Sequence, residues 1–412
     1  MQQTGTLEKI WTKRFISLSL TQFIIFTVFY AFLTTLPIYV IENLGESQSN
    51  AGLVVTFMLA SAIMVRPFSA KVLEVLGKKN TLIMNVVLFT LTTFLYLWID
   101  TFIPLLILRF IHGISFGIVT TATGAIAADI IPASRRGAGM GYFAMAMNLA
   151  IVVGPFIGLT LLQFVSFKSL FFVLSILMVI SVLFSLLVHV VHVEEHRTTR
   201  PSLAIKLSDL IERKAIPVSF IGGLTGIAYG SILSFVPVFA EEIGLGTMSS
   251  YFFLVFAVVM IAFRPYLGRT FDEKGAKIVL VPSLLIFALG LMVLGGTTVT
   301  ITLLVAAGLI GLGYGTLLPG YQTLAIQRTT PKRSGHAIST FFILYDLGIA
   351  FGAFIWGIVI ELYGFQTMYF LGAILMFITA GLLYMQLTQR EKKESNEKKN
   401  KELQVEPVTS QD

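Results

Sequence analysis

One carboxylate, that of Asp346, lies deep inside an apolar run of the sequence that extends from about residue 336 to 360. If this run is a helix, Asp346 lies about 16 Å from its start, near the centre of a lipid bilayer. A carboxylate at that depth costs about 2.5–3.5 kcal/mol on insertion scales, so we expect it to have a partner or to line a cavity. Such a group can carry a proton across a membrane. The alternative is a carboxylate that only holds helices together.

Three further polar side chains lie inside apolar runs. Arg109 lies about 10 Å from the outer end of its own run, which begins at residue 102. This depth is compatible with a charge pair or a shared water cavity with Asp346. His112 follows on the same helical face and is a candidate proton relay or, alternatively, a structural histidine beside a glycine-rich helix contact. Asn148 occupies the position equivalent to Asp346 in an internal repeat described below, and both a contact with substrate and a bond between helices remain open for it.

The sequence lacks the patterns of several kinds of chemistry. It contains no nucleotide-binding GxxxxGK[ST] loop and no HExxH motif. With no cysteine, it has no disulfides, thiolate metal sites or cysteine catalysis. We therefore expect no catalytic residues, no cofactor and no metal. An ion gradient is the expected energy source, with protons as the coupling ion because they need only a titratable group.

The composition indicates the elements that position these residues. The chain is 56% hydrophobic and 12% charged, whereas soluble domains carry about 25% charged residues. A helix of about 20 apolar residues crosses the bilayer, and the sequence contains twelve such runs, near 15–40, 51–70, 80–99, 102–128, 138–164, 168–191, 216–240, 251–268, 278–297, 299–326, 336–360 and 367–388. The predicted fold class is an all-α integral membrane protein with twelve transmembrane helices.

The basic residues predict the orientation, because Lys and Arg accumulate in cytoplasmic loops. With a cytoplasmic N-terminus, all of the 29 Lys and Arg except Arg109 and Lys168 fall in cytoplasmic segments. Both termini are therefore predicted to be cytoplasmic. The basic residues form no cluster on a folded soluble face, so we expect no nucleic-acid partner.

Two polar stretches divide the chain. The predicted organisation is an N-terminal six-helix bundle (1–193), a cytoplasmic middle loop (194–214), a C-terminal six-helix bundle (215–388) and a disordered cytoplasmic tail (389–412). The middle loop has apolar residues at helical spacing and is expected to lie along the inner membrane surface. The tail is too charged to be buried.

The two bundles are copies of one another. RPFSAKVLEVLGKK (66–79) and RPYLGRTFDEKGAK (264–277) match without a gap at an offset of 198 residues, and GPFI at Gly154 corresponds to GAFI at Gly352. Parallel repeats of this kind are typical of carriers with a binding site between the halves near the middle of the membrane. Arg66 and Arg264, which begin the repeated stretch, are expected to extend to the inner interface rather than to bind substrate.

With these motifs, the chain resembles the major facilitator superfamily over nearly its whole length. The resemblance implies that its two six-helix repeats form the major facilitator fold. The family's loop signature fits Gly268, Asp272, Gly275 and Lys277, whereas the first copy departs from it at Ala70 and Glu74. The resemblance implies that these loops form a gate that holds the inner side shut in the outward-facing state, and Lys78 is placed to meet Asp129. The candidate gating residues are Glu74, Gly77, Lys78, Asp129, Gly268, Asp272 and Gly275.

The stretch GYFAMAMNLAIVVGPFIG in the fifth run is similar to the antiporter motif of exporters in this family. Gly141, Gly154, Pro155 and Gly158 have the motif's spacing, although Ala150 and Leu159 replace two of its glycines. The equivalent stretch of the second half has Ala353 in place of the proline, so the motif is confined to the first half, as in those exporters.

The resemblance implies a proton-coupled exporter of small amphiphilic molecules, similar to the bacterial drug:proton antiporters. The expected partners are the substrate, protons and the lipid bilayer of a bacterial cell membrane, with the monomer as the functional unit. The alternative is an exporter of a polar or anionic metabolite, such as a metallophore or sugar, which Arg109 and the lack of an acid in the first run favour. Asp346 and His112 are the candidates for proton coupling, and the candidates for the substrate cavity are Arg109, Asn148, Tyr30, Tyr229, Tyr314 and Tyr345.

Overall fold

The computed structural model describes the chain except for residues 1–8, 133–135, 189–210, 330–333 and 406–412. Within the described ranges the secondary structure is helical, and eleven helices are long and apolar enough to cross a membrane. The long helices are α1 (Lys13–Glu42), α2 (Gln48–Leu76), α3 (Lys78–Leu95), α4 (Phe102–Ile130), α5 (Arg136–Leu162), α6 (Phe167–Leu186), α8 (Ile216–Glu242), α9 (Ser249–Lys274), α10 (Ala276–Gly295), α11 (Thr300–Gln327) and α12 (Ser334–Val405). Three short 3-10 helices are η1 (Tyr96–Trp98), η3 (Arg213–Ala215) and η4 (Gly246–Met248).

Local sequence signals set several of the helix ends. Thr12, Ser47 and Ser166 precede α1, α2 and α6, and each side-chain oxygen accepts a hydrogen bond from a backbone N–H in the first turn. These bonds satisfy donors that a helix start leaves free. The turns between α2 and α3 and between α9 and α10 each consist of one glycine with positive φ, Gly77 (79°) and Gly275 (89°). Because these glycines are equivalent in the repeat, the two halves turn in the same way at the same place.

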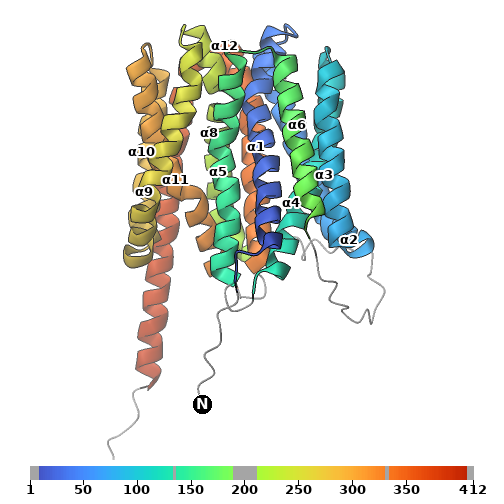
Figure 1. Ribbon diagram of the computed structural model, residues 1–412. Coiled ribbons are helices and arrows are strands. Elements are labelled where there is room, and N and C mark those ends of the chain that lie inside the picture. The colour runs from blue at the N-terminus through green and yellow to red at the C-terminus, as the bar shows by residue number, and fades with distance from the viewer. Residues whose placement is uncertain (1–8, 133–135, 189–210, 330–333, 406–412) are drawn as a thin grey trace, which may run out of the picture.

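The last helix, α12, is 72 residues long and would measure about 108 Å if it were straight. It is interrupted at Gly364, which has φ 79° and ψ 171°. The chain reverses there, and the second arm runs back along the bundle and beyond it (Figure 1). The two arms contain the predicted runs 336–360 and 367–388.

The tail differs from the prediction, because α12 continues as a helix to Val405. The prediction of disorder is therefore wrong for residues 389–405, and residues 406–412 lie outside the described part. Lys, Glu and Gln, which make up much of this stretch, are strong helix formers. Glu391 also pairs with Lys277 at the start of α10, with Nζ and Oε2 3.1 Å apart. The middle loop lies mostly outside the described residues.

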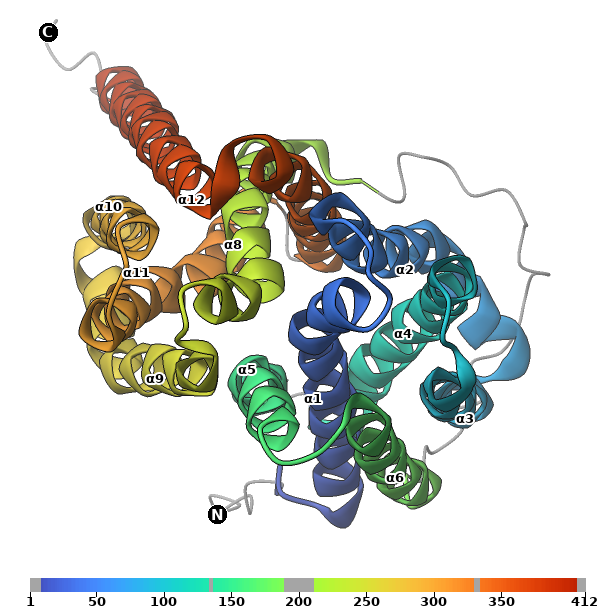
Figure 2. The same cartoon turned by 90° about the horizontal axis from the view of Figure 1, so that it is seen from above.

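The helices form two groups, α1–α6 and α8–α12, which lie side by side (Figure 2). We call them the N half and the C half. The halves meet where α2 packs against α12, α5 against α9 and α1 against α8.

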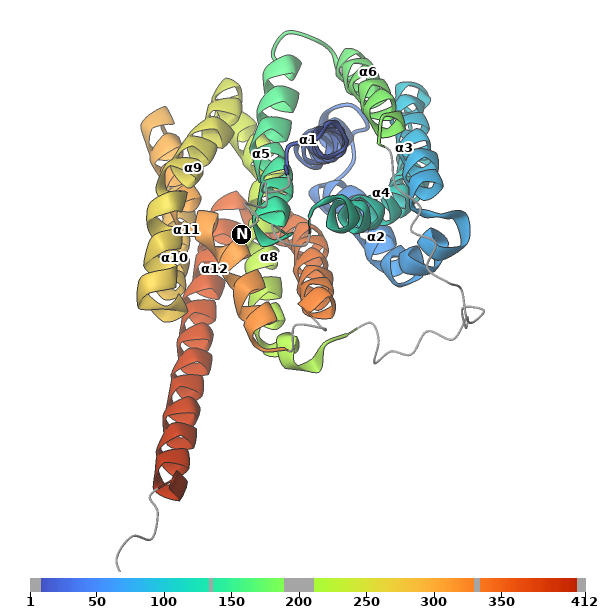
Figure 3. The same cartoon turned by 60° about the horizontal axis from the view of Figure 1, so that its bottom comes forward.

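The two ends of the bundle differ in charge. The start of α1 and the free end of α12 lie at the same end (Figures 1 and 3). This end, which we call the basic end, carries Lys13, Lys78, Lys277, Arg328 and Arg390. The opposite, acidic end carries Glu42, Asp100, Glu241, Glu242 and Glu361.

Candidate functional site

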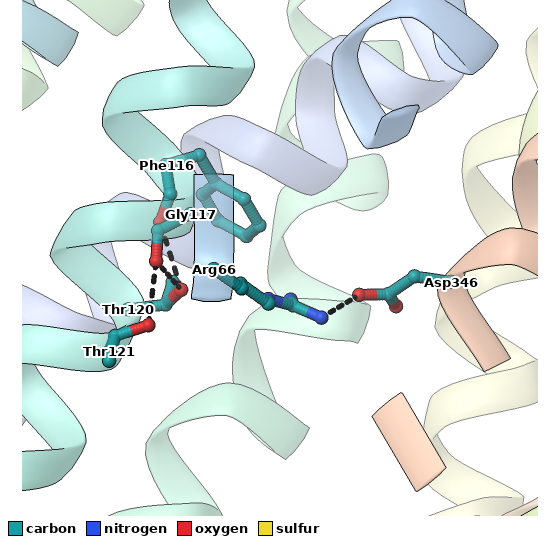
Figure 4. Close-up of polar contacts among 6 residues, drawn as sticks. All are labelled: Arg66, Phe116, Gly117, Thr120, Thr121 and Asp346. Atoms are coloured by element: carbon teal, nitrogen blue, oxygen red, sulfur yellow. Dashed lines mark hydrogen bonds and ion pairs between the residues drawn. The ribbon is translucent and has the colours of Figure 1, made fainter. Parts of the chain in front are cut away.

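An ion pair connects the two halves in the interior of the bundle. Arg66 of α2 points at Asp346 of α12, with Nη1 2.6 Å from Oδ2 (Figure 4). The side chains are 18% and 13% exposed. Arg66 lies ten residues from the end of α2 and Asp346 twelve from the start of α12, about 15 and 18 Å from the basic end. The pair therefore lies near the middle of the apolar thickness of the bundle.

This ion pair corrects two predictions. Arg66 does not extend to the interface, as the sequence analysis expected, because its guanidinium group turns inward to a carboxylate. The predicted partner of Asp346, Arg109, makes a different contact: its Nε donates to the backbone oxygen of Val54 on α2, at 3.0 Å. The sequence places both arginines in apolar surroundings but does not give the direction of either side chain.

Three predicted cavity tyrosines of the C half come together beside Asp346. The rings of Tyr229 on α8 and Tyr314 on α11 are stacked, with centroids 4.1 Å apart. The Tyr314 hydroxyl is hydrogen-bonded to the hydroxyl of Tyr345, the residue that precedes Asp346. Tyr30 of α1 lies near enough to Asp346 and to these three tyrosines to interact with them electrostatically. Tyr30, Tyr314 and Tyr345 thus lie within electrostatic reach of the Asp346 carboxylate, and Tyr229 adjoins them through Tyr314.

Arg109 and His112 form a different cluster, inside the N half. Both are fully buried. Nδ1 of His112 lies 3.0 Å from the hydroxyl of Tyr96, and the ring of Phe89 lies 3.9 Å from the imidazole, measured between centroids. No contact among the described residues connects this cluster to Asp346, and its partners come from α1, α2, α3, η1 and α4.

The antiporter motif lies against α1. A Cβ atom added at Gly154 would stand 2.6 Å from the backbone oxygen of Thr27 and 2.8 Å from Cβ of Tyr30. One added at Gly158 would stand 3.0 Å from the side chain of Thr35. Both glycines therefore let α5 approach α1 within the N half, and Pro155 lies inside α5 between them. For Gly141 and Asn148, the structure describes only the backbone, as part of α5.

The predicted contact between Lys78 and Asp129 is present, with Nζ 2.6 Å from Oδ2. It joins α3 to α4, so it lies within one half. Gly268 lies on the exposed surface of α9. The backbones of Glu74 and Asp272 lie in the last turns of α2 and α9, but their side chains lie outside the described residues. Their role in a gate stays a prediction.

Arg66 was not predicted as a site residue, and neither was a second contact between the same two helices inside the bundle. Thr56 of α2 donates to the backbone oxygen of Ala350 of α12, at 2.7 Å. The repeat itself could have drawn attention to Arg66, because Arg66 and Arg264 begin the two copies of its strongest match.

A helical bundle of two repeated halves with an ion pair and tyrosines between them is the arrangement of a membrane carrier. The sequence profile of the Major Facilitator Superfamily matches residues 18–275 and 253–411. The chain belongs to this family, and it is therefore a multi-pass membrane transporter rather than an enzyme.

Two relatives agree with this assignment. The chain is 23% identical over 355 residues to an uncharacterized MFS-type transporter, MJ1560, of Methanocaldococcus jannaschii, covering 84% of this chain and 91% of the relative. It is 30% identical over 136 residues to the quinolone resistance protein NorA of Staphylococcus aureus, covering 33% of this chain and 35% of NorA.

Solved structures share the fold. The nucleoside transporter NupG superposes with a TM-score of 0.71 at 16% identity and covers 90% of this chain and 99% of its own. The human organic anion transporter MFSD10 (TETRAN) superposes with a TM-score of 0.68 at 15% identity over the same shares. A POT family transporter in complex with 5-aminolevulinic acid has a TM-score of 0.74 at 13% identity, covering 90% of this chain and 95% of its own. At these identities the likeness concerns the fold only.

Proposed function

We propose that the protein is a proton-coupled exporter of small amphiphilic molecules, with Asp346 as the proton carrier. The observation that carries the proposal is the ion pair between Arg66 of the N half and Asp346 of the C half. A titratable group that connects two halves near the middle of the membrane makes their contact depend on protonation. The partial similarity to NorA, a quinolone resistance protein, supports export of drug-like molecules.

Protonation of Asp346 removes its attraction for Arg66. Losing one partner of a buried ion pair costs about 3–5 kcal/mol, because the remaining charge stays in a poorly solvating environment. A basic or hydrogen-bonding group of a substrate stabilises the ionised carboxylate in place of the proton. Substrate and proton then compete for Asp346, and this competition is the condition for exchanging one for the other. The surrounding tyrosines offer flat apolar surfaces for the remainder of an amphiphilic molecule.

For the topology, we propose that the two arms of α12 cross the membrane separately, which gives twelve crossings in two sets of six. The basic end then faces the cytoplasm of a bacterial cell, with both termini on that side. Because the chain has no cysteine, cysteines placed singly at Ser47 and Thr298 should react with an impermeant reagent from outside in intact cells. A cysteine at Ser202 should not react, and its labelling would refute the orientation.

Proton release on binding tests the function directly. At a pH where Asp346 is protonated and not paired with Arg66, a quinolone added to the purified protein in weakly buffered detergent should release protons, because the ligand replaces the proton on Asp346. Asp346→Asn should release none. Binding without proton release in the unsubstituted protein, measured over pH 5–8, would contradict competition at this site.

The second candidate is an exporter of a polar or anionic metabolite, and the observation that favours it is again Arg66, the cation at the site. An anion that replaces Asp346 on Arg66 leaves the carboxylate without a partner and so promotes its protonation. By linkage, binding of the anion and binding of the proton then assist each other. The two then move in the same direction, so export follows the outward gradient of the anion rather than an inward proton gradient. Proton uptake on ligand addition, instead of release, would identify this case.

A further inference from the structure

Two polar contacts at the acidic end join the halves at equivalent positions of the repeat. Nε2 of Gln163, which follows α5, donates to the backbone oxygen of Thr247 and to Oγ of Ser250, each at 3.0 Å. On the other side of the molecule, Oε1 of Glu361 in α12 accepts from the backbone N–H of Ser49 in α2, at 3.4 Å. The repeat offset of 198 residues converts 163 into 361 and 49 into 247. The same two positions of the repeat are thus in contact twice, with the halves exchanged.

The packing beneath one of these contacts is close. A Cβ atom added at Gly357, one turn before Glu361, would stand 2.6 Å from the backbone oxygen of Gln48. The helix that carries Glu361 therefore rests directly on the start of α2. The first N–H groups of a helix have no partner within it, and the helix dipole favours an anion at that end. The carboxylate of Glu361 fits this position because it is both a hydrogen-bond acceptor and an anion.

We propose that Gln163 and Glu361 are positioning residues for alternating access, which hold the acidic end closed at two points and release it together. Each residue belongs to one half and its partner to the other, so any movement that separates the halves at this end breaks both contacts. The proposal rests on the repeat and on these contacts, and it is independent of proton coupling at Asp346.

The two contacts are chemically different, and this makes them separable. Glu361 is an acceptor, so Glu361→Gln retains an oxygen for the Ser49 N–H whereas Glu361→Ala does not. Gln163 is a donor, so Gln163→Leu keeps the size and removes the bond. Each lost hydrogen bond at an exposed site should change the ratio of the two states by about two- to tenfold.

The test measures both ends of the full-length protein at once. Because the chain has no cysteine, spin labels can be attached to a cysteine pair at the exposed positions Asn43 and Thr298, across the acidic end. A second pair at the exposed positions Asn80 and Lys274 reports on the basic end. Double electron–electron resonance then gives the distance distribution at each end. If the distance increases at one end and decreases at the other, the two halves have rotated relative to each other. A loss of stability does not produce such opposite changes.

In the double variant Gln163→Leu/Glu361→Ala, we expect longer distances at the acidic end, shorter distances at the basic end and a shift in population of at least about twofold. Gln163→Leu and Glu361→Ala should each shift less than the double variant, and Glu361→Gln, which keeps the acceptor oxygen but loses the charge, should shift less than Glu361→Ala. The control is Lys168→Ala, which breaks an ion pair with Asp100 at the same end but within one half. Unchanged distances in both single variants, or equal shifts for Glu361→Gln and Glu361→Ala, would overturn the proposal. The single variants decide the matter even if the double variant fails to fold.

Discussion

The N half and the C half are built by the same helix contact but carry different polar groups. In the N half, Gly154 of α5 lies against the backbone oxygen of Thr27 in α1. In the C half, Gly352 of α12 lies against the backbone oxygen of Ile227 in α8. The offset of 198 residues converts Gly154 into Gly352 and places Thr27 within two residues of Ile227. The glycines are therefore the shared framework, since a side chain at either place would collide with the neighbouring backbone.

The polar groups on this framework differ at equivalent positions. Asp346 of the C half corresponds to Asn148 of the N half, and Trp356 corresponds to Gly158. Trp356 donates from Nε1 to the Ile227 oxygen at 2.8 Å, so the α8–α12 contact has an additional bond where α1–α5 has another glycine. One half thus supplies the titratable carboxylate and the other supplies the arginine that pairs with it. The repeat therefore gives the same fold twice, whereas the carboxylate of the ion pair between the halves is present only once among these two equivalent positions.

Replacing the shared glycines should have the largest effect. Gly154→Leu and Gly352→Leu place a bulky side chain where the nearest atom is a backbone oxygen, which cannot move aside. We expect each to lower stability by about 3 kcal/mol, the upper range for overpacking, and to abolish export. Thermal unfolding in detergent measures the first effect and export from cells the second.

The matched control for the glycines is Gly381→Ala in α12, where no heavy atom lies within 4 Å of the added Cβ. This variant should be stable. Normal export by Gly154→Leu would mean that the glycine framework is not needed in the N half and would break the comparison.

The second-largest effect should be a difference in stability between variants of the two arginines of the repeat, Arg66 and Arg264. Arg66→Gln leaves the Asp346 carboxylate without its partner, and we expect a loss of stability of about 3 kcal/mol, the lower end of the range for a buried pair because both side chains are slightly exposed. Arg264→Gln should cost less, because the residue equivalent to Asp346 is the neutral Asn148. Combining Arg66→Gln with Asp346→Asn removes both charges, so thermal stability should recover while export stays lost. Equal costs for the two arginine variants would contradict the asymmetry of the halves.

Removing an exposed ion pair at the basic end should have the smallest effect on stability. The Lys78 and Asp129 side chains are 40% and 44% exposed, and such pairs contribute about 0.2–1 kcal/mol. Lys78→Ala should therefore lower the unfolding temperature slightly, and less so in about 1 M salt, where the charges are screened. The C half has Ala276 at this position and pairs Lys277 with Glu391 instead. Loss of export in a well-folded Lys78→Ala protein would assign the pair to gating.

Most of the fold could be predicted from the sequence, because length and apolarity are sufficient to define a membrane-crossing helix and an offset of 198 residues is visible by inspection. The site was only partly predictable. Asp346 was identified because a carboxylate in an apolar run is costly wherever it points. Its partner was not, because Arg66 and Arg109 are both compatible in depth, and only the packing of α2 against α12 decides which of them meets it. The helix beyond residue 388 could not be predicted from charge, because a strongly charged stretch that cannot be buried can still be rich in helix-forming residues.

The most direct test of the account is to remove the titratable group from the C half. Asp346→Asn gives both halves an asparagine at the equivalent position, and an amide cannot take up and release a proton. In proteoliposomes, the variant should show no proton flux on addition of a quinolone, while counterflow of the same compound without a gradient should persist. Normal proton flux in Asp346→Asn would contradict the central claim that Asp346 carries the proton.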